Sequence, residues 1–433
     1  MSTGIEPTAP PAGDTSEATT ENKAPTEGCP GAPEAPPRYS LRRDVSFPAV
    51  LAGLIAVIVS YSGPLVVVLA AARAGHLDEA HTASWVWAVS IGSGLTCLFL
   101  SWRTRMPVIT AWSTPGVALL MTNLGDYPYA QAIGAFLISA AAIAVIGYSG
   151  LFGRLMRAVP TGVVNAMLAG ILFSFGVSIF TELKTSPAIV LSAFIAFFAM
   201  KRLSVRWAVP VALLAGAGAA LVTTRLDFAL GGGGVLVRPV LTMPDFSLAA
   251  LIGIAIPLAV VTLASQNAPG TAVLEGAGYT PDDRLLVGST GAMSFLLAPF
   301  GSHAVNLAAI TAAICTGPEA HPDPRRRYIA GMSCGIWYLL IGSCGGVLVL
   351  LFAGLPAALI AVVAGVALLG ALQSSLTTAL GEVGTRDAAV VTFLCTASGM
   401  SLFGIGSAFW GLLLGLLTHA LLKTRLPRGD RKT

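Results

Sequence analysis

Charged residues are scarce in this chain, and their scarcity excludes a water-soluble fold. Asp, Glu, Lys and Arg make up 11% of the 433 residues, whereas 55% are hydrophobic. Soluble domains carry about 25% charged residues. The few charges are grouped in short breaks between long apolar runs, which is typical of loops between membrane spans. The formal net charge of +4 is too small to indicate a nucleic-acid partner.

Motifs of enzymes and metal sites are scarce as well. The six cysteines show no paired spacing of a zinc or redox site. The sequence has no HExxH motif and no Gly-Lys dipeptide, which excludes a zincin site and a phosphate-binding loop for ATP. GMSCG at 331–335 fits the pattern G-x-S-x-G, but Ser333 is expected within a helix and not at a strand-to-helix turn. We therefore predict neither an enzyme nor a metal or cofactor site.

The first 39 residues are rich in Pro, Ala, Thr and Glu and contain no apolar run. This composition predicts a disordered tail, because such a segment cannot bury enough apolar surface to fold. It lacks the basic start, apolar stretch and small-residue cleavage site of a signal peptide. Membrane insertion is expected to rely on the first span.

Long apolar runs predict fourteen membrane spans at about 17 to 25 residues per crossing. Seven precede a polar loop with GGGG at 231–234, and seven follow it. The expected spans are 47–72, 83–102, 107–122, 128–150, 158–181, 186–200, 207–224, 248–272, 284–299, 302–317, 327–353, 356–379, 386–402 and 404–423. Several are short or closely spaced, so twelve spans are the alternative count.

The basic residues provide an independent test of orientation, because Lys and Arg collect in cytoplasmic loops. With both termini in the cytoplasm, 21 of the 25 basic residues fall on the cytoplasmic side. The exceptions are Arg73, Lys184, Arg225 and Arg238. A misplaced span in either half would scramble this distribution, so we predict cytoplasmic N- and C-termini.

Seven spans followed by seven give the two halves opposite orientations, as in the inverted repeats of many carriers. The expected organisation is a disordered cytoplasmic tail at 1–39, a first seven-span repeat at 40–225, an extracytoplasmic loop at 226–247 and a second repeat at 248–433 that ends in a short basic cytoplasmic tail. Weak echoes support the repeat: SYSGP at 60–64 parallels SQNAP at 265–269.

The third and tenth spans are short and begin near Pro or Gly, which predicts half-helices that start near mid-membrane. In the third span an extended stretch is expected to run into Thr114 as the N-cap. In the tenth, Gly301 or Ser302 is the expected cap. The helix that follows would carry His303 and Asn306 on one face. Two helix starts supply about one positive charge, enough for one carboxylate without Lys or Arg.

Three segments resemble characteristic segments of the benzoate:proton symporter (BenE) family: ITAWSTPG at 109–116, ASQNAPG at 264–270 and PFGSHAVNLAAITAAICTG at 299–317. The layout is similar to the wider nucleobase/uracil transporter architecture. That architecture implies an all-α fold of fourteen spans, a core domain with the broken third and tenth spans, and a gate domain from spans five to seven and twelve to fourteen. The resemblance implies proton-coupled uptake of benzoate or a similar aromatic acid at a bacterial inner membrane.

The resemblance also implies a substrate site between the two half-helices and the eighth span. Its expected residues are Ser113, Thr114, Gln266, Asn267, Ser302, His303 and Asn306. The wider architecture often has acidic residues on its eighth and tenth spans, where this chain has Gln266, Asn267 and His303. His303 is the expected proton-coupling residue, because it is the titratable side chain nearest the expected site.

Structural alternatives remain for these residues. His303 can instead be a neutral histidine that bonds an adjacent helix. Gln266 and Asn267 can hold a carboxylate or order the eighth span through interhelical hydrogen bonds. Ser113 and Thr114 are expected caps that touch substrate only if the cap faces the cavity.

The function that fits best is secondary transport, with an aromatic carboxylate, a proton and membrane lipid as partners. Assembly of several copies is left open. A carrier of a nucleobase or another organic anion on the same architecture is the alternative substrate class. A channel is less favoured, because broken helices in an inverted repeat suit alternating access. An intramembrane enzyme rests on the GMSCG match alone.

Overall fold

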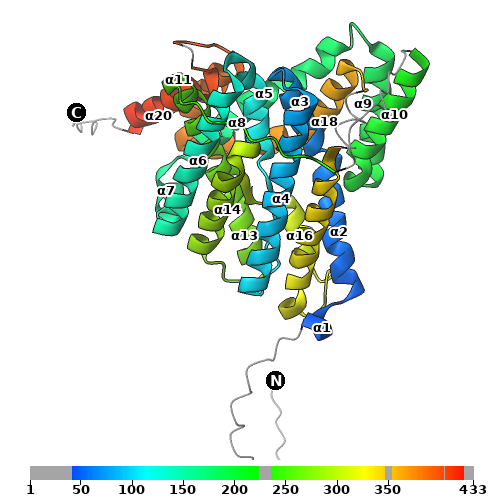
Figure 1. Ribbon diagram of the computed structural model, residues 1–433. Coiled ribbons are helices and arrows are strands. Elements are labelled where there is room, and N and C mark those ends of the chain that lie inside the picture. The colour runs from blue at the N-terminus through cyan, green and yellow to red at the C-terminus, as the bar shows by residue number, and fades with distance from the viewer. Residues whose placement is uncertain (1–40, 224–235, 347–353, 404, 424–433) are drawn as a thin grey trace, which may run out of the picture. The chain divides into compact units, whose positions relative to one another are not determined.

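The computed structural model describes residues 41–223, 236–346, 354–403 and 405–423 (Figure 1). The chain divides into a short unit that ends at Arg43 and a unit from Asp44 to Thr433. Of the first unit only the start of α1 (Leu41–Asp44) is described, and all that follows concerns the second. The expected disordered tail, the GGGG loop and the basic C-terminal tail lie outside the described residues.

Apolar helices form almost all of the described chain. The first half contains α2 (Phe47–Ser62), α3 (Pro64–Ala74), α4 (Glu79–Thr104), α5 (Thr114–Asn123), α6 (Tyr129–Ser149), α7 (Phe152–Ala158), α8 (Thr161–Glu182), α9 (Pro187–Leu203) and α10 (Ala208–Thr223). The second half contains α11 (Leu248–Ala250), η3 (Leu251–Ala255), α12 (Ile256–Thr262), η4 (Leu263–Asn267), α13 (Ala268–Gly276), α14 (Asp283–Leu297), α15 (Ile310–Thr316), α16 (Tyr328–Ser343), α18 (Ala357–Gly381), α19 (Arg386–Ala397) and α20 (Ser407–Lys423). Short 3₁₀ turns join several of them.

The described residues include six helices that are long and apolar enough to cross a membrane: Phe47–Ala74, Glu79–Thr104, Tyr129–Ser149, Thr161–Glu182, Leu248–Gly276 and Ala357–Gly381. The shorter helices α10 and α20 are apolar as well. The chain is therefore an all-helical membrane protein. Each of the fourteen apolar runs expected from the sequence contains at least one described helix. The number of crossings stays a prediction.

Two sets of helices pack among themselves (Figure 1). In one set α4 packs on α14 and α16, α14 packs on α6, and α16 packs on α2. In the other, α8 packs on α18 and α19, while α9 packs on α10 and α18. Small residues allow close approach: a Cβ at Gly147 of α6 would overlap the backbone of Gly288 in α14.

The helix from Leu248 to Gly276 changes its winding twice. Both η3 and η4 are π-helical, and a proline lies shortly after each, Pro257 and Pro269. Proline cannot donate its backbone nitrogen, so it interrupts the regular helical ladder and favours such a rearrangement. π-Helical stretches occur frequently at functional sites. The second stretch, LASQN, contains Gln266 and Asn267.

A two-stranded antiparallel ribbon joins the broken third and tenth segments. Strand β1 (Thr110–Trp112) pairs with β2 (Val305–Leu307), and Ala111 lies opposite Asn306. The extended stretch expected before the third half-helix is therefore present. The tenth segment differs from the prediction, because α15 begins at Ile310 and not after Gly301 or Ser302.

Candidate functional site at the paired half-helices

The ribbon positions the beginnings of α5 and α15. Its strands are antiparallel, so α5 leaves the ribbon after Trp112 and α15 leaves from the opposite end, after Leu307. The N-cap of α5 is Ser113, whose Oγ accepts a hydrogen bond from Gly116 N at 3.1 Å. Thr114, the cap expected from the sequence, is instead the first helical residue. Ser113 is the better cap because its extended backbone lets the side chain turn back onto the first turn.

His303 does not lie on a helix, contrary to the prediction. It stands on the extended chain before β2, is fully buried, and uses both ring nitrogens. Its Nδ1 accepts from Trp85 Nε1 at 3.0 Å, and its Nε2 lies 3.1 Å from the Ser113 carbonyl oxygen. An indole nitrogen only donates and a carbonyl only accepts, so we assign the neutral tautomer with hydrogen on Nε2. This ring links α4 to the cap of α5.

Asn306 also belongs to β2 and not to a helix. In the amide orientation that satisfies both of its atoms, it accepts from Ser113 N and donates to Leu307 O, each at 2.9 Å. Thr262 of α12 donates to Ser113 Oγ at 3.3 Å. Ser113, His303, Asn306 and Thr262 are all buried and meet at the start of α5.

The other end of the ribbon is held by the eighth segment. Asn267 Oδ1 accepts from Leu307 N at 2.9 Å, which links η4 to β2. Asn267 is fully buried, whereas Gln266 is half-buried. The expected residues thus divide between the two ends of the ribbon: Ser113, His303 and Asn306 gather at the start of α5, and Asn267 fixes the strand that leads into α15.

Several buried polar atoms near the ribbon have no hydrogen-bond partner within the described residues. They are Trp112 Nε1 on the ribbon itself, Asn267 Nδ2, Ser302 Oγ, Thr311 Oγ1 and Ser265 Oγ. An unsatisfied buried donor costs about 1–3 kcal/mol, so such atoms concentrate where a polar group completes a site. The helix starts are accessible, since Thr114 is half-buried and Ile310 is 80% exposed.

The C-terminal end of α15 is bound by an arginine. Arg327 is 8% exposed. It donates from Nη1 to the Thr316 carbonyl at 2.6 Å and from Nε to the His321 carbonyl at 2.7 Å. Thr316 is the last residue of α15, so the cation meets the negative end of this short helix. The strand that leads into α15 is therefore held by Asn267, and the end of α15 is held by Arg327.

Three residues of this site were not expected from the sequence. Trp85 donates to His303, Thr262 donates to Ser113, and Ser294 Oγ accepts from Val305 N at 2.7 Å. Trp85 and Thr262 lie 218 and 149 residues from their partners, whereas Ser294 lies only 11 residues before Val305. Thr262 and Ser294 could have been found in the sequence as small hydroxyl residues within apolar runs. Nothing in the sequence around Trp85 marks it as a hydrogen-bond donor to this site.

The site is neutral. None of the seven expected residues is Asp, Glu, Lys or Arg. Within the described residues, no cluster of three or more His, Cys, Asp or Glu could hold a metal ion. What the arrangement offers chemically is a pair of helix beginnings and several amide and hydroxyl groups. Such groups bind anions through N–H donors and helix dipoles, without a countercharge.

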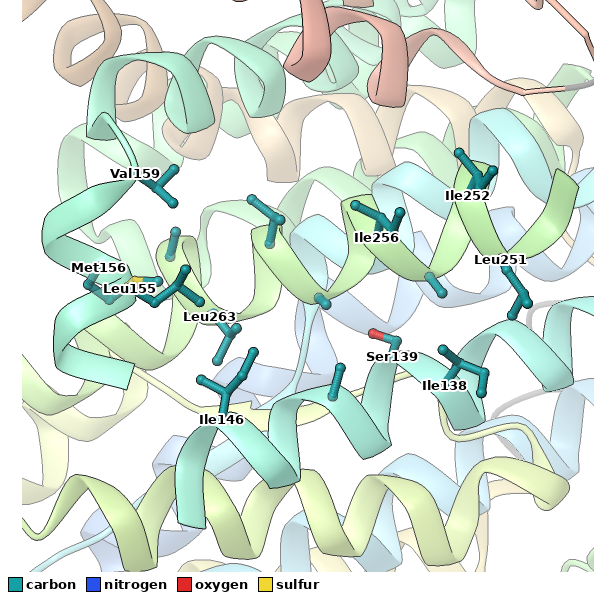
Figure 2. A pocket seen from close by; sticks show the side chains of 15 residues that line it. Ile138, Ser139, Ile146, Leu155, Met156, Val159, Leu251, Ile252, Ile256 and Leu263 are labelled. Carbon is teal, nitrogen blue, oxygen red and sulfur yellow. The ribbon is translucent and has the colours of Figure 1, made fainter. Parts of the chain in front are cut away.

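A cavity of about 330 Å³ lies elsewhere, between α6, α7 and the segment from η3 to η4 (Figure 2). Its lining is almost wholly apolar and includes none of the seven expected residues. An apolar wall cannot satisfy a carboxylate, so we do not assign this cavity to the polar site.

Sequence comparisons match almost the entire described chain. The family described as "Benzoate membrane transport protein" (BenE) matches residues 43–421. The inner membrane protein YdcO of Escherichia coli (strain K12) is 42% identical over 380 residues, which cover 87% of this chain and 96% of that protein. A benzoate membrane transport protein of Acinetobacter baylyi is 38% identical over 388 residues, with 88% and 97% covered.

Solved transporter structures share the fold at low identity. The transmembrane domain of the cyanobacterial bicarbonate transporter BicA has a TM-score of 0.52 and 14% identity, covering 87% of this chain and 96% of that one. The murine anion transporter Slc26a9, facing inward, has a TM-score of 0.55 and 14% identity, with 89% and 69% covered. A further SLC26A9 structure has a TM-score of 0.57 and 16% identity, and the match covers 89% of this chain and 66% of that one.

Proposed function

Because this chain belongs to the BenE family and is a membrane transporter, not an enzyme, we propose that it carries benzoate or a related aromatic carboxylate together with a proton. A relative with 38% identity is described as a benzoate membrane transport protein. The observation that carries the proposal is the ribbon, with an accessible half-helix beginning at each end and no charged residue among its polar groups. A carboxylate can bind there without a neutralising Lys or Arg.

We assign the substrate to the seven residues expected from the sequence, Ser113, Thr114, Gln266, Asn267, Ser302, His303 and Asn306. Asn267 Nδ2 and Thr311 Oγ1 are buried donors without a partner in the described chain. Asn267 bonds Leu307, three residues before α15, and Thr311 is the second residue of α15. The carboxylate would accept from these donors at the start of α15. Its ring would lie against the apolar chain around Ile310.

We assign proton coupling to His303. In the described state Nδ1 accepts from Trp85, so an added proton on Nδ1 would place two N–H donors against each other. Protonation therefore requires that the indole or the imidazole moves. Because Nε2 bonds the Ser113 carbonyl, this movement would reach the cap of α5 directly. Proton binding and the geometry of the anion site would be coupled by this single ring.

We propose that the chain crosses a bacterial inner membrane fourteen times as two inverted repeats, at 40–225 and 248–433, joined by an extracytoplasmic loop at 226–247. Both termini would be cytoplasmic. One relative is described as an inner membrane protein, and each expected span contains a described helix. The helices α8, α9, α10, α18, α19 and α20 would form the gate, and the segments with the ribbon would form the core.

The alternative substrate is a nucleobase or another organic anion. Its support is the fold itself, which the chain shares with structures described as a bicarbonate transporter and an anion transporter. A polar heterocycle would use amide groups such as those of Gln266 and Asn267. The same transport assay distinguishes the substrates by competition.

The test is uptake of radiolabelled benzoate into proteoliposomes with an inward proton gradient. The gradient is collapsed by an ionophore in a parallel sample. Neutral benzoic acid crosses lipid unaided, so empty liposomes give the background. We expect saturable uptake above background that disappears with the gradient. Uptake equal to that of empty liposomes, from protein with a normal melting curve, would refute benzoate as substrate and leave the other anions to be screened.

Two variants of His303 separate its structural role from its proposed role in coupling. His303→Gln can keep both hydrogen bonds, with its amide oxygen facing Trp85 and its amide nitrogen facing Ser113, but it cannot take up a proton. We expect this variant to fold and exchange benzoate while losing proton-driven accumulation. His303→Ala removes both bonds and should also lower stability. Accumulation by His303→Gln at the normal rate would remove His303 from the coupling mechanism.

A further inference from the structure

The cavity between α6, α7 and the helix from Leu248 to Gly276 is partly open, and Figure 2 shows the side chains that line it. Ile138 and Ile256 line it from opposite walls and are 44% and 43% exposed. The rest of the lining is aliphatic, apart from Met156 and Ser139. The Ser139 side chain is fully covered. In a membrane protein, an apolar opening of this kind suits hydrocarbon, and an acyl chain matches its lining.

Helix α7 closes one end of this cavity with one face and carries positive charge on the other. Leu155 and Met156, together with Val159 just after the helix, point into the cavity. Arg154 and Arg157 are exposed and leave the helix on the opposite face. Within the described residues, neither arginine forms an ion pair with a carboxylate.

The position of α7 along the chain places it near the membrane surface. It begins three residues after the end of α6, which is long enough to span the bilayer. Gly150, with φ +73°, makes the tight turn between the two helices. An amphipathic helix directly after a span lies at the level of the lipid headgroups, with its basic residues toward the phosphates.

We propose that this cavity binds one acyl chain of an anionic phospholipid, whose phosphate lies beside α7 at the level of the headgroups, where the long, exposed side chains of Arg154 and Arg157 can reach it. The cavity alone cannot select a lipid, because lipid tails are as apolar as the leucine and isoleucine side chains that line it. Selection comes from the two cations. Its volume of about 330 Å³ holds part of one chain, and its wall offers a carboxylate or nucleobase at most the single hydroxyl of Ser139.

The bound lipid would contact the connection between the two sets of helices. α7 joins α6 to α8, and the opposite wall of the cavity runs into η4, which carries Asn267. A lipid chain wedged between them would limit how α7 and the eighth segment move relative to each other. The proposal does not depend on the transported substrate, so its test is independent of the uptake assay.

The experiment is native mass spectrometry of the full-length protein, titrated with phosphatidylglycerol or with phosphatidylcholine of the same acyl chains. Each arginine near a membrane surface contributes about 1 kcal/mol to the binding of anionic lipid. Two arginines should therefore give phosphatidylglycerol about thirtyfold higher affinity than phosphatidylcholine. Arg154→Gln with Arg157→Gln should abolish this preference. Ala142→Phe, which fills the cavity, should remove the tight site for both lipids.

Two control variants match these changes. Arg202→Gln removes an exposed arginine at the end of α9, and Val145→Phe enlarges a residue of α6 that is 66% exposed and outside the cavity. Both should bind phosphatidylglycerol as the wild type does. Equal affinity of the wild type for the two lipids, or unchanged binding by folded Ala142→Phe, would overturn the proposal. Displacement of phosphatidylglycerol by an equal concentration of glycerol 3-phosphate would also overturn it, because this result would indicate a site for free phosphate.

Discussion

Replacing Arg327 by methionine should loosen the half-helix α15. Methionine keeps the apolar stem but is shorter, and it loses two short hydrogen bonds, to the Thr316 and His321 carbonyls. A hydrogen bond from a charged donor contributes about 1.5–3 kcal/mol. Taking the lower figure for both bonds gives about 3 kcal/mol, which corresponds to roughly a hundredfold increase in local opening. Hydrogen exchange of the α15 amides, followed by mass spectrometry, measures this opening directly.

The neighbouring Arg326 provides the control. Its side chain is 44% exposed, and its Nε lies 3.6 Å from Asp44 and 3.7 Å from Asp323. The pair with Asp323 is exposed on both sides and contributes about 0–1 kcal/mol, and neither Asp44 nor Asp323 belongs to α15, so Arg326→Met should change the exchange of α15 by less than about fivefold. Arg327→Lys keeps the charge but loses the several N–H donors of the guanidinium. The exchange rate of the α15 amides in this variant should lie between those of Arg326→Met and Arg327→Met. Protection of α15 that is the same in Arg327→Met and in the wild type would refute the assignment of Arg327 as the anchor of this helix.

Three further results are expected. Asp78 caps α4 by accepting from His81 N at 2.7 Å, and this bond holds the pKa of its carboxyl below the usual range. The stabilisation by this carboxylate is therefore present above the unfolded pKa of about 3.9, and it is lost as the pH falls through the lower pKa of the folded state. The melting temperatures of the wild type and Asp78→Asn should consequently converge or cross below about pH 4. Gly147→Ala should lower the free energy of unfolding by about 1–3 kcal/mol, because its Cβ would overlap Gly288. A Cβ at Gly370 of α18 meets no atom within 4 Å, so Gly370→Ala should raise the free energy of unfolding by about 0.5–1 kcal/mol in the same denaturation assay. Asn267→Asp keeps an acceptor for Leu307 N but replaces the free amide donor by a carboxyl that opposes the substrate's own. In variant protein that keeps the wild-type melting curve, benzoate binding by calorimetry should weaken at least tenfold, and unchanged affinity would remove Asn267 from the site.

The fold class and most helices could be predicted because they depend on local composition. Long apolar runs specify helices wherever the solvent is lipid, since an unpaired backbone group there costs several kcal/mol. The extended stretch before α5 was also predictable, because Pro115 follows a hydroxyl residue and fixes the start of the helix. The cap was misplaced by one residue. Ser113 and Thr114 have equivalent side chains, so only the backbone conformation decides between them.

The tenth segment could not be predicted from local sequence. Residues 302–309 have no helix breaker, and alone they favour a helix. They are extended because β1 and Ser294 bond the backbone of 305–307, and Asn267 bonds Leu307. These partners come from three separate segments. The same reason explains why Trp85 was missed, since it meets His303 across 218 residues of chain.

The two half-helix beginnings are held by unlike side chains, and this asymmetry has a consequence for transport. At the start of α5 the Ser113 carbonyl is bound by His303, a side chain that can gain a proton. Near the start of α15, Leu307 is bound by Asn267, which cannot. Under the proposed function, a proton would change the geometry at one end of the ribbon and leave the other end in place. The substrate carboxylate would then keep its donors at α15 while the start of α5 rearranges, so that proton and anion can occupy the protein together.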